Sequence, residues 1–271
     1  MTVRAVTTPD GIRLHTRSDG DPANPGLLLL NSLGTDLSMW DAQVAGWSGT
    51  HHVVRFDQRG HGRSDAPEGP YTVEQLGRDA LTVADAHQLE TTDVCGLSLG
   101  GLVALWVASH TPQRMRRAVF ADTAARVGTE DAWRSRAATV REDGMDAVTD
   151  LVLQRFFSPA FRAGGDPAVA RVEGMLRAGQ VAGYAASCDA LAVADLREAA
   201  TRIEAPSLVI VGTADEATPP ADAQALGALL PRAELAELPG AGHLANLEQP
   251  QRFEQLVSDF LSRPNQELPH A

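Results

Sequence analysis

The chain has 271 residues, with 23 basic and 35 acidic side chains and a formal net charge of −12 at pH 7. This charge argues against nucleic acid as a partner, because phosphate binding needs a basic face. An anionic substrate would be repelled at long range and would need arginines close to it.

Cysteine content and apolar runs bear on where the chain works. The two cysteines indicate no disulfide framework and fit a reducing cytoplasm. The first residues lack the apolar segment of a signal peptide, and the apolar runs are far too short to span a bilayer. A cytoplasmic protein without a membrane partner is therefore expected, while the oligomeric state is left open.

Short apolar runs alternate with helical patterns along most of the chain. Residues 3–7 and 12–18 flank a Pro-Asp-Gly turn and predict a hairpin. Further strands are expected at residues 27–30, 53–56, 93–95, 119–121, 208–211 and 235–238.

Helices are expected between these strands. Thr72 opens one, because its spacing to Gln75 is that of a capping box. Residues 99–109 and 249–261 have helical length and apolar content. The alternation predicts an α/β fold, a mostly parallel twisted sheet with helices on both faces.

One region interrupts the alternation. Residues 128–194 show helical patterns and no good strand, which predicts a helical cap, or lid, inserted into the core. The expected division is a core of residues 1–125 and 196–263, a cap of residues 126–195, and a flexible polar tail of residues 264–271.

A glycine-rich stretch contains the candidate nucleophile. Gly96-Leu97-Ser98-Leu99-Gly100 is a G-x-S-x-G motif, directly after a predicted strand and before a predicted helix. In that context the motif forms a sharp turn that presents the serine hydroxyl above the sheet. The alternative is an ordinary glycine-rich turn whose serine caps the helix, but the strand–turn–helix context favours Ser98 as a nucleophile.

A serine hydroxyl needs a base and a group that orients the base. His243 follows the last predicted strand, and Asp215 follows the strand before it, which satisfies the chain order Ser…Asp…His. Asp122 is the rival acid, since it also follows a strand. His61 belongs to the stretch Arg59–Ser64, which we interpret as a structural loop.

The oxyanion of an acyl transfer needs two backbone amides. One is expected from Leu99, the residue after the nucleophile, and the other from Leu33 in the loop after the strand of residues 27–30. No metal-ligand spacing and no phosphate-binding glycine loop is evident, so neither a metal nor another cofactor is expected.

At this point the chain resembles the α/β hydrolases and, more narrowly, the 3-oxoadipate enol-lactonases. The patterns D-x-R-G-x-G-x-S and G-x-S-x-G mark only the fold, whereas three other stretches are narrower. These are NSLGTDLSMW (31–40), DTAARVG (122–128) with Trp133 and Arg136, and GYAASCDALAVADLR (183–197). One departure is Asp122, where the resemblance leads us to expect asparagine.

The resemblance implies hydrolysis of a small anionic lactone through an acyl-enzyme on Ser98. It implies that an arginine meets the substrate carboxylate, and Arg126 and Arg136 are the alternatives. Ser32 and Trp40 near the oxyanion loop, and Trp133 in the cap, are further candidates for substrate contact, although an aromatic at helical spacing is more often core.

Three other functions of the same fold are alternatives. A general carboxylesterase or perhydrolase acting on small esters or lactones would share the triad and differ in its pocket. A non-catalytic binding protein of the same fold would be expected to lose the triad, and all three members are present. A haloalkane dehalogenase would need aspartate at position 98, where this chain has serine.

Overall fold

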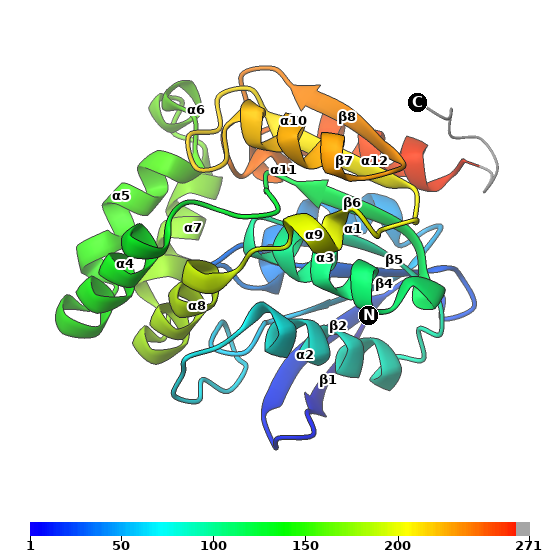
Figure 1. The fold of residues 1–271 in the computed structure, drawn as a ribbon, viewed down its shortest axis with the longest axis horizontal. Helices are drawn as coiled ribbons and strands as arrows, with labels where there is room; N and C mark the ends of the chain where they lie inside the picture. Colours follow the sequence, from blue (N-terminus) through cyan, green and yellow to red (C-terminus); the bar gives the residue numbers. More distant parts are fainter. Residues whose placement is uncertain (264–271) are drawn as a thin grey trace.

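The computed structural model describes residues 1–263; the tail expected at residues 264–271 lies outside the described residues. Eight strands form one sheet in the order β1-β2-β4-β3-β5-β6-β7-β8 (Figure 1). The strands are β1 (Thr2–Thr7), β2 (Arg13–Asp19), β3 (Gly26–Leu30), β4 (His52–Phe56), β5 (Thr92–Leu97), β6 (Met115–Ala121), β7 (Ser207–Gly212) and β8 (Ala233–Leu238). All eight overlap the predicted strands, so the predicted sheet is confirmed.

The burial of each strand follows from its place in the sheet. β2 pairs antiparallel with β1 and β4, and the remaining pairs are parallel. The central strands β3 and β5 are buried at every residue, as strands covered on both faces must be. The edge strand β1 is exposed at every residue except Val6, and β2 beside it buries alternate residues.

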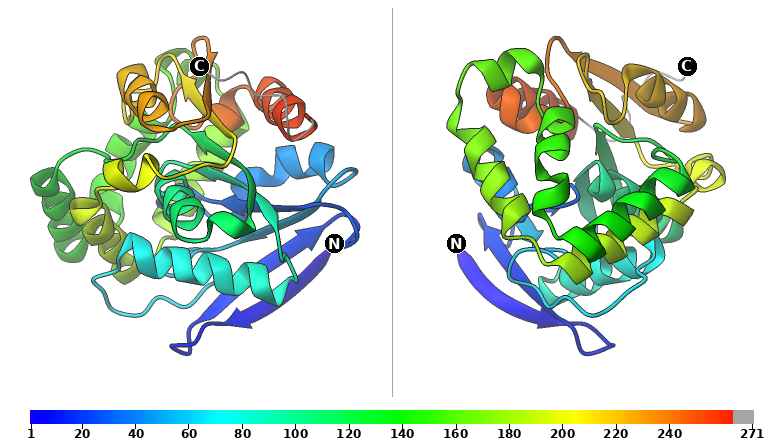
Figure 2. Two further views of the ribbon diagram at one scale, coloured as in Figure 1. Left: turned by 45° about the vertical axis from the view of Figure 1, so that its right-hand side comes forward. Right: turned by 90° about the vertical axis from the view of Figure 1, so that its left-hand side faces the viewer.

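Helices cover both faces of the sheet (Figure 2). α2 (Val73–Ala86) packs on α3 (Leu99–His110), and α1 (Asp41–Trp47) packs on α12 (Pro250–Leu261). The Thr72 side chain accepts the Gln75 amide at 3.1 Å, which confirms the predicted cap of α2. The sequence did not predict α1, α9 (Arg197–Ala200), α10 (Pro220–Leu229) or α11 (Ala245–Glu248).

Helices alone make up the region between β6 and α9. They are α4 (Glu130–Asp143), α5 (Asp146–Phe156), α6 (Pro159–Ala163), α7 (Pro167–Arg177) and α8 (Val181–Val193). We call these the cap helices; α4 and α8 lie along each other, and the group comes to the front in the right-hand view of Figure 2. The predicted helical character of this region is confirmed.

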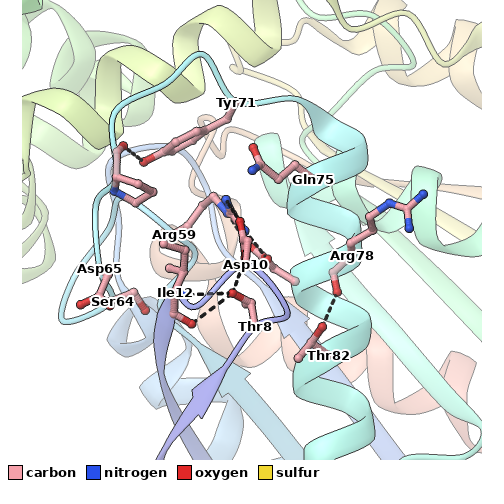
Figure 3. Close-up of polar contacts among 12 residues, drawn as sticks. Thr8, Asp10, Ile12, Arg59, Ser64, Asp65, Tyr71, Gln75, Arg78 and Thr82 are labelled. Carbon is pink, nitrogen blue, oxygen red and sulfur yellow. Dashed lines mark hydrogen bonds and ion pairs between the residues drawn. The ribbon is translucent and has the colours of Figure 1, made fainter.

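Ion pairs hold the loop after β4. Arg59 is almost fully buried, and its guanidinium contacts Asp79 at 2.5 Å and Asp10 at 3.1 Å (Figure 3). His61 is buried in the same loop with Nδ1 3.1 Å from the Arg59 carbonyl, and burial lowers its pKa. A buried histidine held within its own loop fits the structural interpretation of residues 59–64.

No helix among residues 1–263 combines the length and the apolar character that crossing a bilayer would require.

Candidate active site

Ser98 sits in the tight turn between β5 and α3, with φ 58° and ψ −116°. A positive φ is strained for a residue with a side chain, so the surroundings must enforce it. The Ser98 amide donates to the Ala121 carbonyl at 3.0 Å, and its own carbonyl accepts from Thr123 Oγ1 at 2.8 Å. A Cβ at Gly100 would lie 2.2 Å from the Leu30 carbonyl oxygen, so only glycine allows α3 to begin this close to β3.

His243 and Asp215 form a buried pair on two neighbouring loops. His243 Nδ1 lies 2.8 Å from Asp215 Oδ2, and the two side chains are 2% and 0% exposed. Thr218 donates to Asp215 through its hydroxyl at 2.8 Å and through its amide at 3.0 Å. With Nδ1–H donated to Asp215, the lone pair of the neutral imidazole is on Nε2.

The environment keeps Asp215 ionised. Burial raises the pKa of this carboxyl, but the charge of His243 and the hydrogen bonds from His243 and Thr218 outweigh burial and leave the pKa below its usual range. A charged carboxylate beside the imidazole stabilises an imidazolium.

Asp122, the rival acid, occupies a different position. Its Oδ1 accepts the Gly212 amide at 2.8 Å, and its side chain is fully buried. Burial raises the pKa of Asp122 well above its usual range, and the neighbouring Asp215 charge raises it further. The hydrogen bond to His243 is therefore made by Asp215, while Asp122 holds the backbone at the end of β7.

A small cavity of about 70 Å³ joins Ser98 and His243 to the cap helices. That volume holds several water molecules, since one needs about 10–15 Å³. The lining residues are Leu33, Ser98, Val127, Gly128, Ala132, Trp133, Arg136, Val152, Arg155, Phe156, Tyr184, Ala217 and His243.

The cavity wall on the cap side is cationic. Arg136 and Arg155 both line it. Among residues 1–263, no aspartate or glutamate belongs to the lining. The Arg136 guanidinium lies 4.8 Å from the centre of the Trp133 ring, and Arg155 donates to the Glu216 carbonyl at 3.3 Å. Burial lowers the pKa of Arg155, and Arg136 lowers it further.

Tyr184 adds a polar atom to this wall. Its side chain is 1% exposed, and its hydroxyl makes no well-formed hydrogen bond with any other described residue. Burial raises the pKa of Tyr184, and the neighbouring Arg136 guanidinium opposes the rise. Two guanidinium groups and this hydroxyl on one wall are suited to an anionic group.

The candidate oxyanion amides belong to different elements. Leu33 lines the cavity, and Leu99 is the first residue of α3. In the part of the chain that the structure describes, neither backbone amide donates a hydrogen bond. Both amides are thus available to a ligand.

Comparison with known proteins identifies the family of the chain. The family model of the alpha/beta hydrolase fold matches residues 25–250. The chain is 39% identical over 258 residues to 3-oxoadipate enol-lactonase 2 of Acinetobacter baylyi, which covers 95% of this chain and 96% of that protein. The chain belongs to the 3-oxoadipate enol-lactonase family of α/β hydrolases. The resemblance seen in the motifs is confirmed.

Solved structures similar to this enol-lactonase family member cover the cap as well as the core. The enol-lactonase of Burkholderia xenovorans LB400 has a TM-score of 0.92 and 40% identity, and covers 97% of this chain and 100% of its own. A thermophilic esterase from Thermogutta terrifontis with malate bound has a TM-score of 0.90 at 26% identity, and covers 96% of this chain and 98% of its own.

Three of the residues expected to contact substrate lie outside the cavity of this enol-lactonase family member. Trp40 is fully buried in the core, where Nε1 donates to Asn31 at 3.0 Å and its ring packs on Phe253. Ser32 does not belong to the cavity lining, and its hydroxyl is buried without a partner among the described residues. The Arg126 side chain is 45% exposed and lies 3.7 Å from Asp195, so of the two alternative arginines the structure places Arg136 in the cavity.

Sequence analysis missed Arg155, Phe156 and Tyr184. A signal for two of them was available, because Val152, Arg155 and Phe156 are spaced i, i+3, i+4 and therefore share one face of α5. Nothing in the sequence indicates that this face, rather than the opposite one, meets Ser98.

Proposed function

We propose that this chain hydrolyses 3-oxoadipate enol-lactone to 3-oxoadipate, with Ser98 as nucleophile, His243 as general base and Asp215 as the group that orients His243. The observation that carries the proposal is the cavity itself. It places Ser98 and the Asp215-bound His243 beside two arginines without a lining carboxylate, in a member of the enol-lactonase family.

In the first half-reaction Ser98 Oγ attacks the lactone carbonyl while His243 Nε2 takes its proton. Asp215 stabilises the imidazolium that forms. The amides of Leu33 and Leu99 hold the carbonyl oxygen as it becomes negative. The ring C–O bond then breaks, and the ring oxygen leaves as an enol that takes the proton from His243 and tautomerises to a ketone.

In the second half-reaction His243 removes a proton from water, and the hydroxide attacks the acyl-enzyme carbonyl. The Ser98 C–O bond breaks, Ser98 regains its proton from His243, and the carboxylic acid product leaves and releases its own proton to water. The enol is a good leaving group, which makes ring opening favourable.

The substrate carboxylate is assigned to the cationic wall. Arg136 is held in place by stacking on Trp133, whose Nε1 donates to the Val127 carbonyl at 2.7 Å. Arg155 approaches from α5. A guanidinium pairs with a carboxylate in a bidentate geometry. The two arginines therefore attract the substrate carboxylate at short range, which opposes its long-range repulsion by the net charge of −12.

A general carboxylesterase acting on small esters is the second candidate. The similarity to the esterase from Thermogutta terrifontis favours it, because that protein shares the fold over nearly the whole chain.

We also place the reaction in the cytoplasm, since both cysteines are free and buried.

The direct test is the ultraviolet decay of enzymatically generated enol-lactone with wild type and Ser98→Ala, alongside p-nitrophenyl acetate. We expect rapid lactone loss, a fall of at least about 10³-fold in Ser98→Ala, and weak acetate hydrolysis. Good acetate hydrolysis without lactone turnover would assign the chain to the general esterases.

A second test concerns the cationic wall. Monomethyl succinate and methyl butyrate differ by a carboxylate in place of a methyl group. We expect Arg136→Gln and Arg155→Gln each to lower kcat/KM for monomethyl succinate by about 10- to 100-fold, the value of a charged hydrogen bond, with little change for methyl butyrate. Arg134→Gln is the matched control, because Arg134 is on α4 but exposed and paired with Glu130 at 2.8 Å. Equal losses on both esters would contradict the assignment.

A further inference from the structure

The C-terminal end of α5 contacts both loops of the candidate triad. We call residues 155–158 the α5 corner. Arg155 donates to the carbonyl of Glu216, the residue after Asp215, at 3.3 Å. The Phe156 carbonyl accepts the amide of Leu244, the residue after His243, at 2.9 Å. A short segment of the cap thus contacts the backbone beside the acid and beside the base.

Glu248 holds this corner from the core side. Its Oε1 accepts the Ser158 amide at 2.6 Å, and its Oε2 accepts the Ser158 hydroxyl at 2.7 Å. Ser158 is only 4% exposed, so these charge-assisted hydrogen bonds are shielded from water. The backbones are also close, because a Cβ at Gly242 would lie 2.6 Å from the Ser158 nitrogen.

The corner carries two side chains that matter to the site. The Phe156 ring stacks on the His243 ring, with centres 5.4 Å apart and planes at 30°. This contact limits rotation of the imidazole away from Asp215. The preceding residue, Arg155, projects into the cavity wall. Whatever fixes the corner therefore fixes both the base and one of the two cavity arginines.

We propose that Glu248 is a positioning residue: by holding Ser158 it keeps Phe156 against the His243 ring and Arg155 in the cavity wall. The inference rests on the proposed roles of Ser98, His243 and Asp215. It adds that orientation of the base and recognition of the substrate carboxylate depend on one contact between core and cap. A change that frees the corner weakens both.

The test compares Glu248→Ala, Glu248→Gln, Ser158→Ala and the double variant Glu248→Ala/Ser158→Ala with wild type. The rate at which a fluorophosphonate labels Ser98 measures activation by His243 without the lactone. The downfield proton resonance of His243 Nδ1–H reports its bond to Asp215. Glu173→Gln is the control, because it disrupts an exposed ion pair with Arg177 within the cap.

We expect Glu248→Ala to slow labelling by about 10- to 100-fold, the effect of a small misplacement of a reacting group, and to broaden or shift the histidine resonance. Glu248→Gln should lose less, because its amide oxygen still accepts from Ser158. The double variant should lose less than the two single losses combined, because the Ser158 hydroxyl bond to Glu248 is removed by either change, while Ser158→Ala also removes the hydroxyl that caps α6. The preference for monomethyl succinate over methyl butyrate should fall in parallel.

Labelling within twofold of wild type in Glu248→Ala, or an equal loss in Glu173→Gln, would overturn the proposal. Failure of the proposed function is separate. In that case wild type would not consume the enol-lactone, yet the labelling rates would still rank the Glu248 and Ser158 variants.

Discussion

Asp122 and Asp215 are neighbouring buried carboxyl groups with opposite electrostatics. The pKa of Asp215 is lowered, because the charge of His243 and three hydrogen bonds outweigh burial. The pKa of Asp122 is raised by burial and by the Asp215 charge. Two neighbouring buried carboxyl groups do not both ionise readily, and the opposite pKa shifts favour the proton on Asp122 and the charge on Asp215.

This division predicts unequal effects of two similar substitutions. Asp215→Asn should lower kcat/KM by about 10⁴-fold, the loss seen in serine proteases when the orienting aspartate becomes asparagine. Asp122→Asn should change it less than about tenfold, because asparagine still accepts the Gly212 amide and replaces a group that favours its neutral form. Steady-state rates on the enol-lactone or on a small ester measure both. A larger loss in Asp122→Asn would reverse the assignment of the acid.

At the scale of elements, the turn that carries Ser98 was predictable because its determinants are contiguous. Five consecutive residues, from the end of β5 to the start of α3, specify both the strained backbone of Ser98 and the close approach at Gly100. The strands were predictable for a similar reason, since a strand buried on both faces is a continuous apolar run.

The cavity wall was less predictable because it is assembled from separate helices. Trp133 and Arg136 come from α4, Arg155 from α5 and Tyr184 from α8. Which face of each helix meets the core depends on how the cap helices pack, and periodicity does not fix that. Trp40 shows the same limit: closeness in sequence to the oxyanion loop did not reveal that its ring points into the core.

At the scale of the whole molecule, buried charge is found at both ends of the sheet. Ser98 follows the C-terminal end of β5, whereas Asp93 lies near the N-terminal end of the same strand. Asp93 is fully buried, and neither of its carboxylate oxygens makes a well-formed hydrogen bond with a described residue. Arg116 is 3.5 Å away and His51 is 3.9 Å away. Burial raises the pKa of Asp93 to about 6, although Arg116 and Arg117 oppose the rise.

The raised pKa of Asp93 predicts how stability depends on pH. The folded state binds this proton more tightly than the unfolded state, so the contribution of Asp93 to the free energy of unfolding falls as pH rises from about 4 to about 6 and stays lower above that range. A positive charge on His51 would stabilise the ionised Asp93. Burial and Arg116 lower the pKa of His51, so it is neutral near pH 7 and supplies no such charge.

Asp93→Asn removes this titration, so its stability relative to wild type should increase with pH. Roughly one pKa unit of the shift is expressed between pH 5 and pH 8, which corresponds to about 1.4 kcal/mol. Urea unfolding of both proteins at the two pH values measures the difference directly. Because other titrating groups are common to both chains, their contributions cancel. A stability difference that is the same at pH 5 and pH 8 would mean that Asp93 is already ionised in the folded state at pH 5.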